Sequence, residues 1–427
     1  MITVNKTIGL AFLGTLLLGL APTHAEIQSS TDASNPVPNQ GSVIDRLQAA
    51  YDNTHDTGIV YHLARVTFTR GEFEQAGRWL KLLVKADWKM GLDPDDFTND
   101  AAPAAVRNLI WQLQTAVPKQ DGAGAIISTL HDPALVPESI AFDSANRKLI
   151  AGSLVRPRLV AKTMVEDQPL GPDTEIRLPK GVDWGVMYGI KFNEARGELW
   201  VLNNRTDKDG MHGNLSVLNR RGVLVKNYRF DGEPAVELND LCFSEDYVYA
   251  TDSTASRLYR GDISGDVLEV FYQSEDISFP NGIACTVASD KLYVSDFRGV
   301  STINTSNPSG HLRLNVADGF SVGGIDGLYL WKNQLVGIQN YLGTPKIVMV
   351  DPEQLEIDSP VKLMDINRPE FRIPTTGFIK GNCLFYIANS SLDALGPGGA
   401  IDPNQPAPGA AIIIGLDLRL QGEKCGL

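Results

Sequence analysis

Hydrophobic and polar positions change their period near residue 120. Between residues 43 and 116, apolar residues recur every three to four positions, first through Val43–Ala50 and then through Tyr61–Phe68. Gly71 interrupts this pattern, which resumes over Phe73–Leu83. Since a period near 3.6 places these residues on one face of a helix, the sequence predicts a small helical region over 43–116.

Part of this region, Leu63–Asp93, resembles one tetratricopeptide-type helical hairpin, with small or apolar residues at Ala64, Gly71, Ala76 and Leu80. A solenoid needs about three such units to bury its faces. We therefore expect the hairpin to pack against the domain that follows. The alternative is that it binds a protein partner.

From about residue 122 the chain consists of short runs of Val, Ile, Leu and Tyr separated by Gly, Asp, Asn and Pro, which is typical of all-β proteins. A strand, a polar turn and a second strand ending in a polar residue recur six times. The apolar anchors of the first strands are Ile140, Ile190, Leu241, Ile283, Leu328 and Phe378. Their spacings of 50, 51, 42, 45 and 50 residues leave room for four strands each. The pattern predicts a mainly β fold, a six-bladed β-propeller over 122–420.

The sequence also predicts how the ring of blades closes. Gly124–Leu130 is an isolated strand-like run before the first repeat, and Ala411–Leu416 is a third strand after the sixth. The early run can supply the missing outer strand of the last blade and remove an exposed edge.

The first residues predict export. Lys6 precedes an apolar run over Ile8–Ala21, and Thr23–Ala25 places small residues at a cleavage site. About 14 apolar residues are too few to span a bilayer, so we expect a cleaved signal peptide over 1–25 and a periplasmic or secreted protein. The polar stretch 26–42 is expected to be a flexible linker.

The formal net charge of −13 argues against nucleic acid as a partner, since binding to phosphates requires basic patches. No other segment approaches membrane-spanning length. Among the four cysteines, Cys242 and Cys285 lie in apolar strand runs and are expected to be buried and unpaired. A Cys383–Cys425 bridge that fastens the C-terminal tail remains open.

Residues two positions before each anchor should line the mouth of the central channel. We name this set the first ring: it consists of Glu138, Tyr188, Asn239, Asn281, Asp326 and Thr376. Four of the six are carboxylates or amides, whose oxygens suit Ca²⁺, or another divalent cation such as Mn²⁺, Mg²⁺ or Zn²⁺. The sequence predicts metal ligands at Glu138, Asn239, Asn281 and Asp326. The alternative is that these residues merely cap strand starts, as Asn and Asp often do.

The ends of the second strands should reach the same face and form a second ring: Ser153, Asn203, Asp252, Asp296, Asn340 and Asn389. With Tyr188 and Thr376 of the first ring, Asn203, Asn340 and Asn389 are candidates for substrate binding. Asp326, Asp252 and Asp296 are candidate proton acceptors. The connection Asn204–Gly213 could overhang the mouth as a lid, and Trp184 could line it.

Four short motifs resemble the senescence marker protein/gluconolactonase propellers, the sugar-lactonase family: Pro137–Asp143, Asn239–Asp240, Pro280–Ala284 and Asp326–Leu328. The resemblance covers roughly residues 122–420. It implies a divalent metal held by Glu138, Asn239, Asn281 and Asp326, the same four that the repeat spacing indicates. Pro137–Ser139 is also similar to strictosidine-synthase-like propellers.

Two departures from the family stand out: Ser139 follows Glu138 where Glu-Gly-Pro is common, and Glu237 occupies the place of a substrate-gripping Arg. The first hypothesis is a metal-dependent hydrolase of a lactone or related cyclic ester, in which the cation polarises the carbonyl for attack by water. The second is a non-catalytic propeller that binds a ligand or a protein, with a structural metal.

Overall fold

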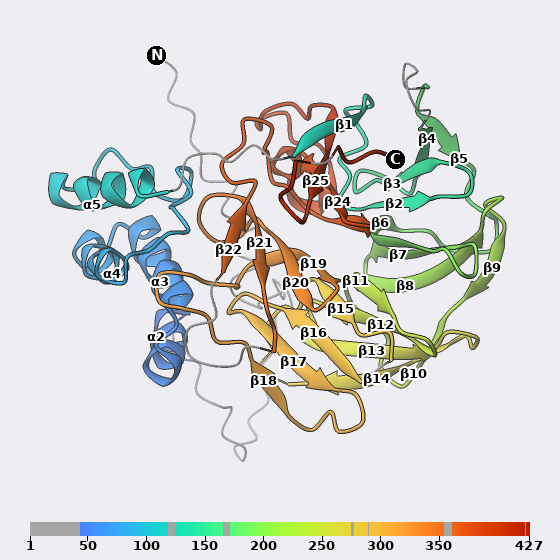
Figure 1. Cartoon of the computed structure of the whole chain (residues 1–427), viewed down its shortest axis with the longest axis horizontal. Coiled ribbons are helices and arrows are strands. Elements are labelled where there is room, and N and C mark those ends of the chain that lie inside the picture. Colours follow the sequence, from blue (N-terminus) through green and yellow to red (C-terminus); the bar gives the residue numbers. More distant parts are fainter. Residues whose placement is uncertain are drawn as a thin grey trace.

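The computed structural model describes residues 43–117, 124–164, 171–274, 277–288, 290–353, 361–422 and 424–427. The expected signal peptide (1–25) and linker (26–42) lie outside the described residues. Six sheets, all antiparallel except for one parallel strand pair in blade three, surround a common centre, which confirms the six-bladed β-propeller (Figure 1). The innermost strands of successive blades contact one another around the channel.

The first three blades contain the following strands, from the channel outward. Blade one has β2 (Ile140–Asp143), β3 (Lys148–Gly152), β4 (Leu159–Thr163) and β5 (Thr174–Ile176); blade two has β6 (Val186–Asn193), β7 (Glu198–Asp207), β8 (Gly210–Asn219) and β9 (Leu224–Asn227); blade three has β11 (Leu238–Phe243), β12 (Tyr247–Asp252), β13 (Arg257–Asp262), β14 (Val267–Gln273) and β10 (Arg229–Asp231). The fifth strand of blade three, β10, pairs parallel with β14 and was not expected from the repeat.

The remaining blades follow the same order. Blade four has β15 (Ile283–Cys285), β16 (Lys291–Ser295), β17 (Val300–Asn304) and β18 (His311–Arg313); blade five has β19 (Ile325–Trp331), β20 (Gln334–Gln339), β21 (Lys346–Val350) and β22 (Lys362–Met364); blade six has β23 (Gly377–Lys380), β24 (Cys383–Asn389), β25 (Ala411–Asp417) and β1 (Ala125–Leu130). Thus β1 pairs antiparallel with β25, with Leu130 opposite Ala411, and the expected closure is confirmed.

Strands in the middle of a blade are covered on both faces by the neighbouring blades. All five residues of β21 are buried, so this strand shows no alternation of apolar and polar positions. Buried apolar clusters accordingly join side chains of adjacent blades, such as Ile150 in blade one with Val201 in blade two.

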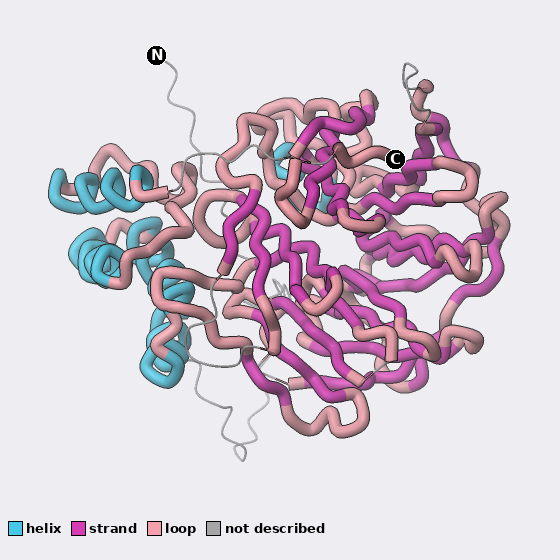
Figure 2. The backbone as a smooth tube through the Cα atoms, in the orientation of Figure 1, coloured by secondary structure: helices cyan, strands magenta, loops and turns pink. Residues whose placement is uncertain are grey.

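In the described part of the chain, four helices precede the blades and lie at one side of the propeller (Figure 1, Figure 2): α2 (Val43–Thr54), α3 (Thr57–Thr69), α4 (Phe73–Lys85) and α5 (Ala104–Thr115). The side chain of Asp56 caps α3 by accepting a hydrogen bond from the Gly58 amide at 2.7 Å. Gly71, at a φ of 76°, turns the chain between α3 and α4. Tyr61 and Leu80 share one buried cluster with Val322 and Val348, so the hairpin packs against blades four and five.

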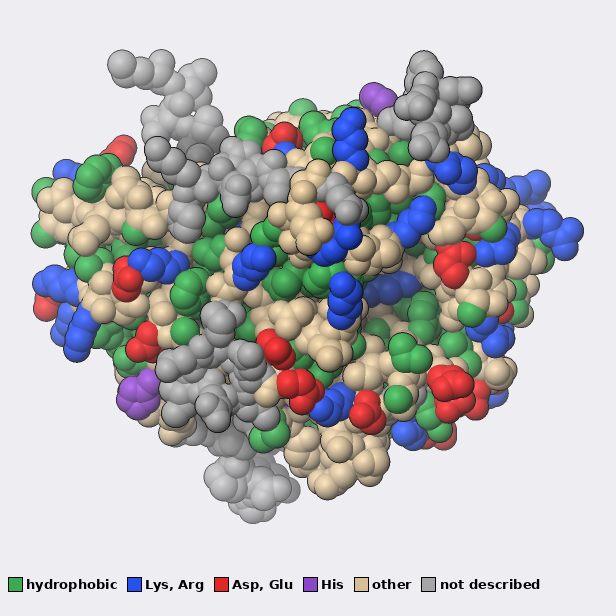
Figure 3. All heavy atoms as spheres, viewed as in Figure 1, with side chains coloured by type: hydrophobic (Ala, Val, Ile, Leu, Met, Phe, Trp, Pro, Cys, Tyr) green, Lys and Arg blue, Asp and Glu red, His purple; other side chains and the backbone are tan. Residues whose placement is uncertain are grey.

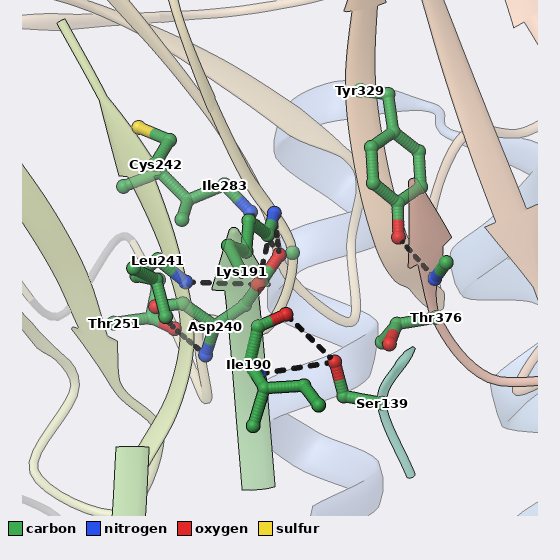
Figure 4. Close-up of polar contacts among 12 residues, drawn as sticks. Ser139, Ile190, Lys191, Asp240, Leu241, Cys242, Thr251, Ile283, Tyr329 and Thr376 are labelled. Carbon is green, nitrogen blue, oxygen red and sulfur yellow. Dashed lines mark hydrogen bonds and ion pairs between the residues drawn. The ribbon is translucent and has the colours of Figure 1, made fainter. Parts of the chain in front are cut away.

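Polar contacts around the channel join each blade to the next, and Figure 4 shows several of them, including those of Ser139, Lys191 and Tyr329. Lys191 forms an ion pair with Asp240 at 3.0 Å, which links blades two and three. The other links are hydrogen bonds: Ile190 N to Ser139 Oγ, Thr251 Oγ1 to Asn281 O, Ser295 Oγ to Ile325 O, Gly377 N to Tyr329 Oη and Thr376 Oγ1 to Glu138 O. Since each contact crosses a blade boundary, the first strands are fixed relative to one another.

All four cysteines form disulfides, Cys242–Cys285 and Cys383–Cys425. The expectation that Cys242 and Cys285 are unpaired was therefore wrong. Their strands, β11 and β15, are the innermost strands of consecutive blades, and this brings the two Cα atoms to 5.8 Å. The Cys383–Cys425 bridge fastens the C-terminal tail to β24.

No helix among the described residues is long and apolar enough to cross a membrane. The face seen in Figure 3 carries both acidic and basic side chains over the blades.

Candidate metal centre at the channel mouth

Three first-ring residues follow a sharp turn of the backbone. Val136, Phe279 and Gly324 have φ angles of 37°, 57° and 64°, and each stands two positions before a candidate ligand: Glu138, Asn281 and Asp326. For a valine or a phenylalanine this left-handed conformation is strained, and such residues concentrate at functional sites. The repeated turn therefore sets the direction in which three of the four ligand-bearing strands leave the mouth.

Glycines let the ligand-bearing strands approach one another. A Cβ atom at Gly282 would lie 2.5 Å from the carbonyl oxygen of Asp326, and one at Gly189 would lie 2.5 Å from that of Asn239. Real side chains are not found at such distances from backbone atoms, so only glycine permits this spacing. The glycine that follows Asn281 thus keeps blades four and five close together at the mouth.

The four predicted ligands are buried, with exposed fractions of 6% for Glu138, 6% for Asn239, 7% for Asn281 and 1% for Asp326. Each has a buried side-chain oxygen without a hydrogen-bond partner among the described residues: Glu138 Oε2, Asn239 Oδ1, Asn281 Oδ1 and Asp326 Oδ1. Asn340 Oδ1 of the second ring is a fifth. Buried polar atoms almost always have a partner, and leaving one unpaired costs about 1–3 kcal/mol.

The electrostatics place these groups near one another. Burial raises the pKa of Glu138 well above its usual range, and the charge of Asp326 raises it further. Burial also raises the pKa of Asp326 to about 7, although hydrogen bonds from the side chains of Asn340 and Asn281 lower it. A buried carboxylate whose pKa is raised by a neighbouring carboxylate, as that of Glu138 is by Asp326, is destabilising as an anion unless a cation neutralises it.

This donor set fits a hard divalent cation. Two carboxylates and up to three amide carbonyls provide oxygen ligands only, which Ca²⁺ accepts readily. Within the described ranges, no group of three or more His, Cys, Asp or Glu side chains is placed to hold a metal ion. The candidate set contains only two such residues, and its other members are amides.

Most members of the second ring have their polar atoms paired. Asn203 accepts a hydrogen bond from the Gly185 amide at 3.0 Å, and Asn389 accepts one from the Ser391 hydroxyl at 2.8 Å. Ser153 Oγ accepts a hydrogen bond from the Val155 amide at 3.2 Å. These side chains hold the turns at the ends of the second strands.

The two aspartates of the second ring are still more heavily bonded. Asp252 accepts hydrogen bonds from the amides of Val236 and Glu237 and forms an ion pair with Arg257 at 3.3 Å. Asp296 forms a two-point ion pair with Arg313, at 2.9 and 3.0 Å, and accepts hydrogen bonds from three backbone amides. Their role as proton acceptors stays a prediction, and these bonds do not favour it.

The three remaining candidates are Asn340, Thr376 and Tyr188, and each forms hydrogen bonds near the predicted ligands. Asn340 donates hydrogen bonds from Nδ2 to Asp326 Oδ2 and to the carbonyl of Pro374, both at 2.7 Å, which orients the Asp326 carboxylate. Thr376 donates from Oγ1 to the carbonyl of Glu138 at 2.9 Å and so joins blade six to blade one. The Tyr188 hydroxyl donates to Glu237 Oε1 at 3.4 Å.

The sequence did not indicate several aromatic residues beside the site. A small hollow is lined by Phe279, Asn281, Asp296, Phe297, Gly324, Ile325 and Tyr341. Burial raises the pKa of Tyr341 well above its usual value, and the charges of Asp326 and Glu138 act in the same direction, so this hydroxyl lies near both carboxylates. Tyr341 directly follows Asn340, and the continuation of the second strands beyond their polar ends could have revealed it.

The expected lid over Asn204–Gly213 is a regular hairpin in which β7 and β8 stay paired as far as Asp207 and Gly210. Arg205 forms ion pairs with Asp183 and Asp207 at its tip. Trp184 donates a hydrogen bond to the Pro179 carbonyl at 3.0 Å and packs against the apolar cluster of blades one and two.

Comparison with known proteins adds support for the fold. No family model matches the chain, and no curated protein matches it. Among solved structures, the chain is similar to the major allergen Mala s 1 of Malassezia sympodialis, with a TM-score of 0.50 and 12% identity over 68% of this chain and 96% of that one. At this identity the likeness concerns the fold alone.

Two further structures are similar at lower scores. They are the PQQ-bound aldose sugar dehydrogenase of Streptomyces coelicolor (TM-score 0.43, 12% identity, 70% of this chain and 99% of that chain) and a luciferin-regenerating enzyme (0.44, 16%, 68% and 96%). We base no argument on them.

Proposed function

We propose that this propeller is a metal-dependent hydrolase of a lactone or related cyclic ester. The observation that carries the proposal is the group of buried oxygens without partners at Glu138, Asn239, Asn281, Asp326 and Asn340. Burying five such atoms without a ligand would cost several kcal/mol, and a bound cation removes that cost.

In this proposal Glu138, Asn239, Asn281 and Asp326 hold the cation, and Asn340 orients Asp326 through its amide. A bound cation supplies Lewis acidity that polarises the ester carbonyl. Asp326 is also the candidate acceptor for the proton of the attacking water, because burial raises the pKa of this carboxylate to about 7. Glu237 lies beside the proposed cation site, and its carboxylate accepts hydrogen bonds from Tyr188 and Thr254.

We also propose that the protein is exported. Both disulfides support this, since such bonds persist in the periplasm or outside the cell and are rare in the cytosol.

The test is a panel of lactones assayed with the purified chain in the presence of Ca²⁺, Mn²⁺ or Zn²⁺, together with metal analysis of the native protein. The matched variant carries Asn281→Ala and Asp326→Ala. We expect hydrolysis that requires one of the metals and falls about 10³-fold in the variant, the loss of roughly 4 kcal/mol of transition-state stabilisation. Equal rates in parent and variant would remove the proposal.

A second candidate function, binding of a protein partner through the helical region, is favoured by one observation. A hollow on the surface of α2 and α4 is lined by Gln48, Gln75, Arg78, Trp79, Lys81 and Leu82. Trp79→Ala should abolish capture of a partner by the full chain, whereas Trp111→Ala, at the 68% exposed tryptophan of α5, should not. Equal capture by both variants, or none by the parent, would count against this function.

A further inference from the structure

The hollow beside the candidate ligands has aromatic walls. Phe279, Phe297 and Tyr341 are half-buried, so part of each ring faces open space next to Asn281. The ring centroids of Phe279 and Phe297 lie 6.2 Å apart, and those of Phe297 and Tyr341 lie 6.5 Å apart. The three rings line the hollow together and are tilted to one another by 55° and 48°; we name this group the aromatic wall.

The aromatic wall is held rigidly in place. Phe297 also contacts the ring of His62 in α3, with the centroids 5.7 Å apart, so the helical region supports the wall from behind. Phe279 keeps a left-handed backbone at φ 57°, which is strained for an aromatic residue.

Besides Asn281, which the proposal assigns to the cation, and the Tyr341 hydroxyl, few polar groups in the hollow could bind the hydroxyls of a sugar. Asp296, the only carboxylate among its described lining residues, has both oxygens occupied by Arg313 and by backbone amides. Asn203, Asp252 and Asn389, which could have reached toward a sugar from the second ring, are likewise engaged within their own turns. A polyhydroxylated substrate would leave its hydroxyls unpaired against the rings, which is unfavourable.

We propose that the substrate is a lactone or cyclic ester that carries a flat apolar ring, and that the aromatic wall stacks against this ring. The inference rests on the proposed function and specifies its substrate class. In the reaction, the bond between the acyl carbon and the ring oxygen breaks. The oxygen of the attacking water bonds to the acyl carbon and keeps one proton, and its other proton passes to the ring oxygen. The product is a hydroxy acid.

The experiment compares three lactones with the same six-membered ring on the calcium-loaded chain. Dihydrocoumarin carries a fused aromatic ring, δ-valerolactone carries nothing, and D-glucono-1,5-lactone carries hydroxyls. The leaving group of dihydrocoumarin is also a phenol and therefore leaves more readily, so each kcat/KM is compared with the rate of hydrolysis of the same lactone by hydroxide. We expect the enzyme to favour dihydrocoumarin by about tenfold beyond that intrinsic difference, because the fused ring adds an apolar contact.

Substitution of the aromatic wall sharpens the test. Phe297→Ala should reduce the ratio of kcat/KM for dihydrocoumarin over δ-valerolactone by about tenfold, mainly through KM. Phe297→Leu, which keeps packing against His62, should reduce it in the same direction and guards against a folding defect. The control Phe271→Ala, a half-buried ring on β14 packed against Tyr249, should leave the ratio unchanged.

The outcomes separate the two proposals. A preference for the sugar lactone would overturn the apolar substrate class alone. So would an equal loss of kcat/KM on dihydrocoumarin and δ-valerolactone in the Phe297 variants. Absence of calcium-dependent hydrolysis of all three lactones would overturn the proposed function and this inference together.

Discussion

The channel mouth carries two rings of similar polar residues that differ in their hydrogen bonds. In the first ring, Asn281 and Asp326 each keep a buried oxygen that has no partner among the described residues. In the second ring, Asp252 and Asp296 accept hydrogen bonds at both carboxylate oxygens. Unpaired buried oxygens raise the free energy of the folded chain, whereas paired carboxylates lower it. Side chains of the same types therefore have opposite effects in the two rings.

This difference distinguishes side chains that stabilise the fold from side chains that we propose to bind a cation. A paired carboxylate such as Asp296 holds a turn together, and its loss leaves Arg313 without its counter-charge. A buried carboxylate such as Asp326, whose charge raises the pKa of Glu138, disfavours the folded state, and in our proposal a bound cation would remove this cost. Stability and calcium binding should therefore respond in opposite ways to changes in the two rings.

The largest effect on stability is expected from Asp296→Asn. The substitution removes one partner of a buried ion pair and should lower the free energy of unfolding by about 3–5 kcal/mol. Calcium should still raise the melting temperature, since the first ring is intact. Chemical denaturation with and without calcium measures both quantities, and loss of the calcium response would contradict the separation of the rings.

The ion pair between Asp296 and Arg313 predicts that the free energy of unfolding depends on pH. Burial raises the pKa of Asp296, but the charge and hydrogen bonds of Arg313 outweigh this and hold the pKa below its usual 3.8. Because the folded-state pKa is depressed, the unfolded chain binds the proton more tightly. The stabilisation by Asp296 is therefore present above about pH 4 and is lost as the pH falls through the folded-state value. The stability difference between parent and Asp296→Asn should shrink on acidification. A constant difference would show that the ion pair is not its source.

The two disulfides offer a matched pair of somewhat smaller effect. They close similar lengths of chain, with sequence separations of 43 and 42, and only Cys242–Cys285 joins two ligand-bearing first strands, β11 and β15. Replacing either pair by alanines should lower the free energy of unfolding by about 2–4 kcal/mol. Loss of Cys242–Cys285 should in addition weaken calcium binding about tenfold, as measured by calorimetry. Equal calcium affinity in both variants would contradict a coupling between this bridge and the site.

Sequence reasoning predicted the blades and the closure of the ring by β1 because these depend on spacing along the chain, whereas the role of the first ring stays a prediction. An apolar anchor such as Ile283 recurs wherever an innermost strand recurs, and the residue two positions earlier follows from the geometry of the strand. The helical hairpin broken at Gly71 was predictable for the same reason.

The bonding of the second ring could not be predicted, because it depends on partners distant in the sequence. Nothing near Asp296 in the sequence indicates that Arg313 and the Ser278 amide converge on it. The Cys242–Cys285 bridge crosses between blades in the same way. Alignment of the repeats shows that the two cysteines lie one and two residues after their anchors, and this signal could have predicted the bridge.

The smallest expected change in stability is that of Asp326→Asn, and whether it stabilises or destabilises the calcium-free chain distinguishes the two rings. Asp326→Asn removes a negative charge beside Glu138 while keeping an oxygen that can accept the Asn340 hydrogen bond, so the calcium-free variant should be more stable than the parent by ~1–2 kcal/mol. The same variant should lose most of the calcium-dependent rise in melting temperature. Melting curves in chelator and in calcium, for the parent, Asp326→Asn and Asp296→Asn, test both statements together. If Asp326→Asn destabilises the calcium-free chain as Asp296→Asn does, the two rings share one structural role, and the unpaired oxygens do not mark a metal site.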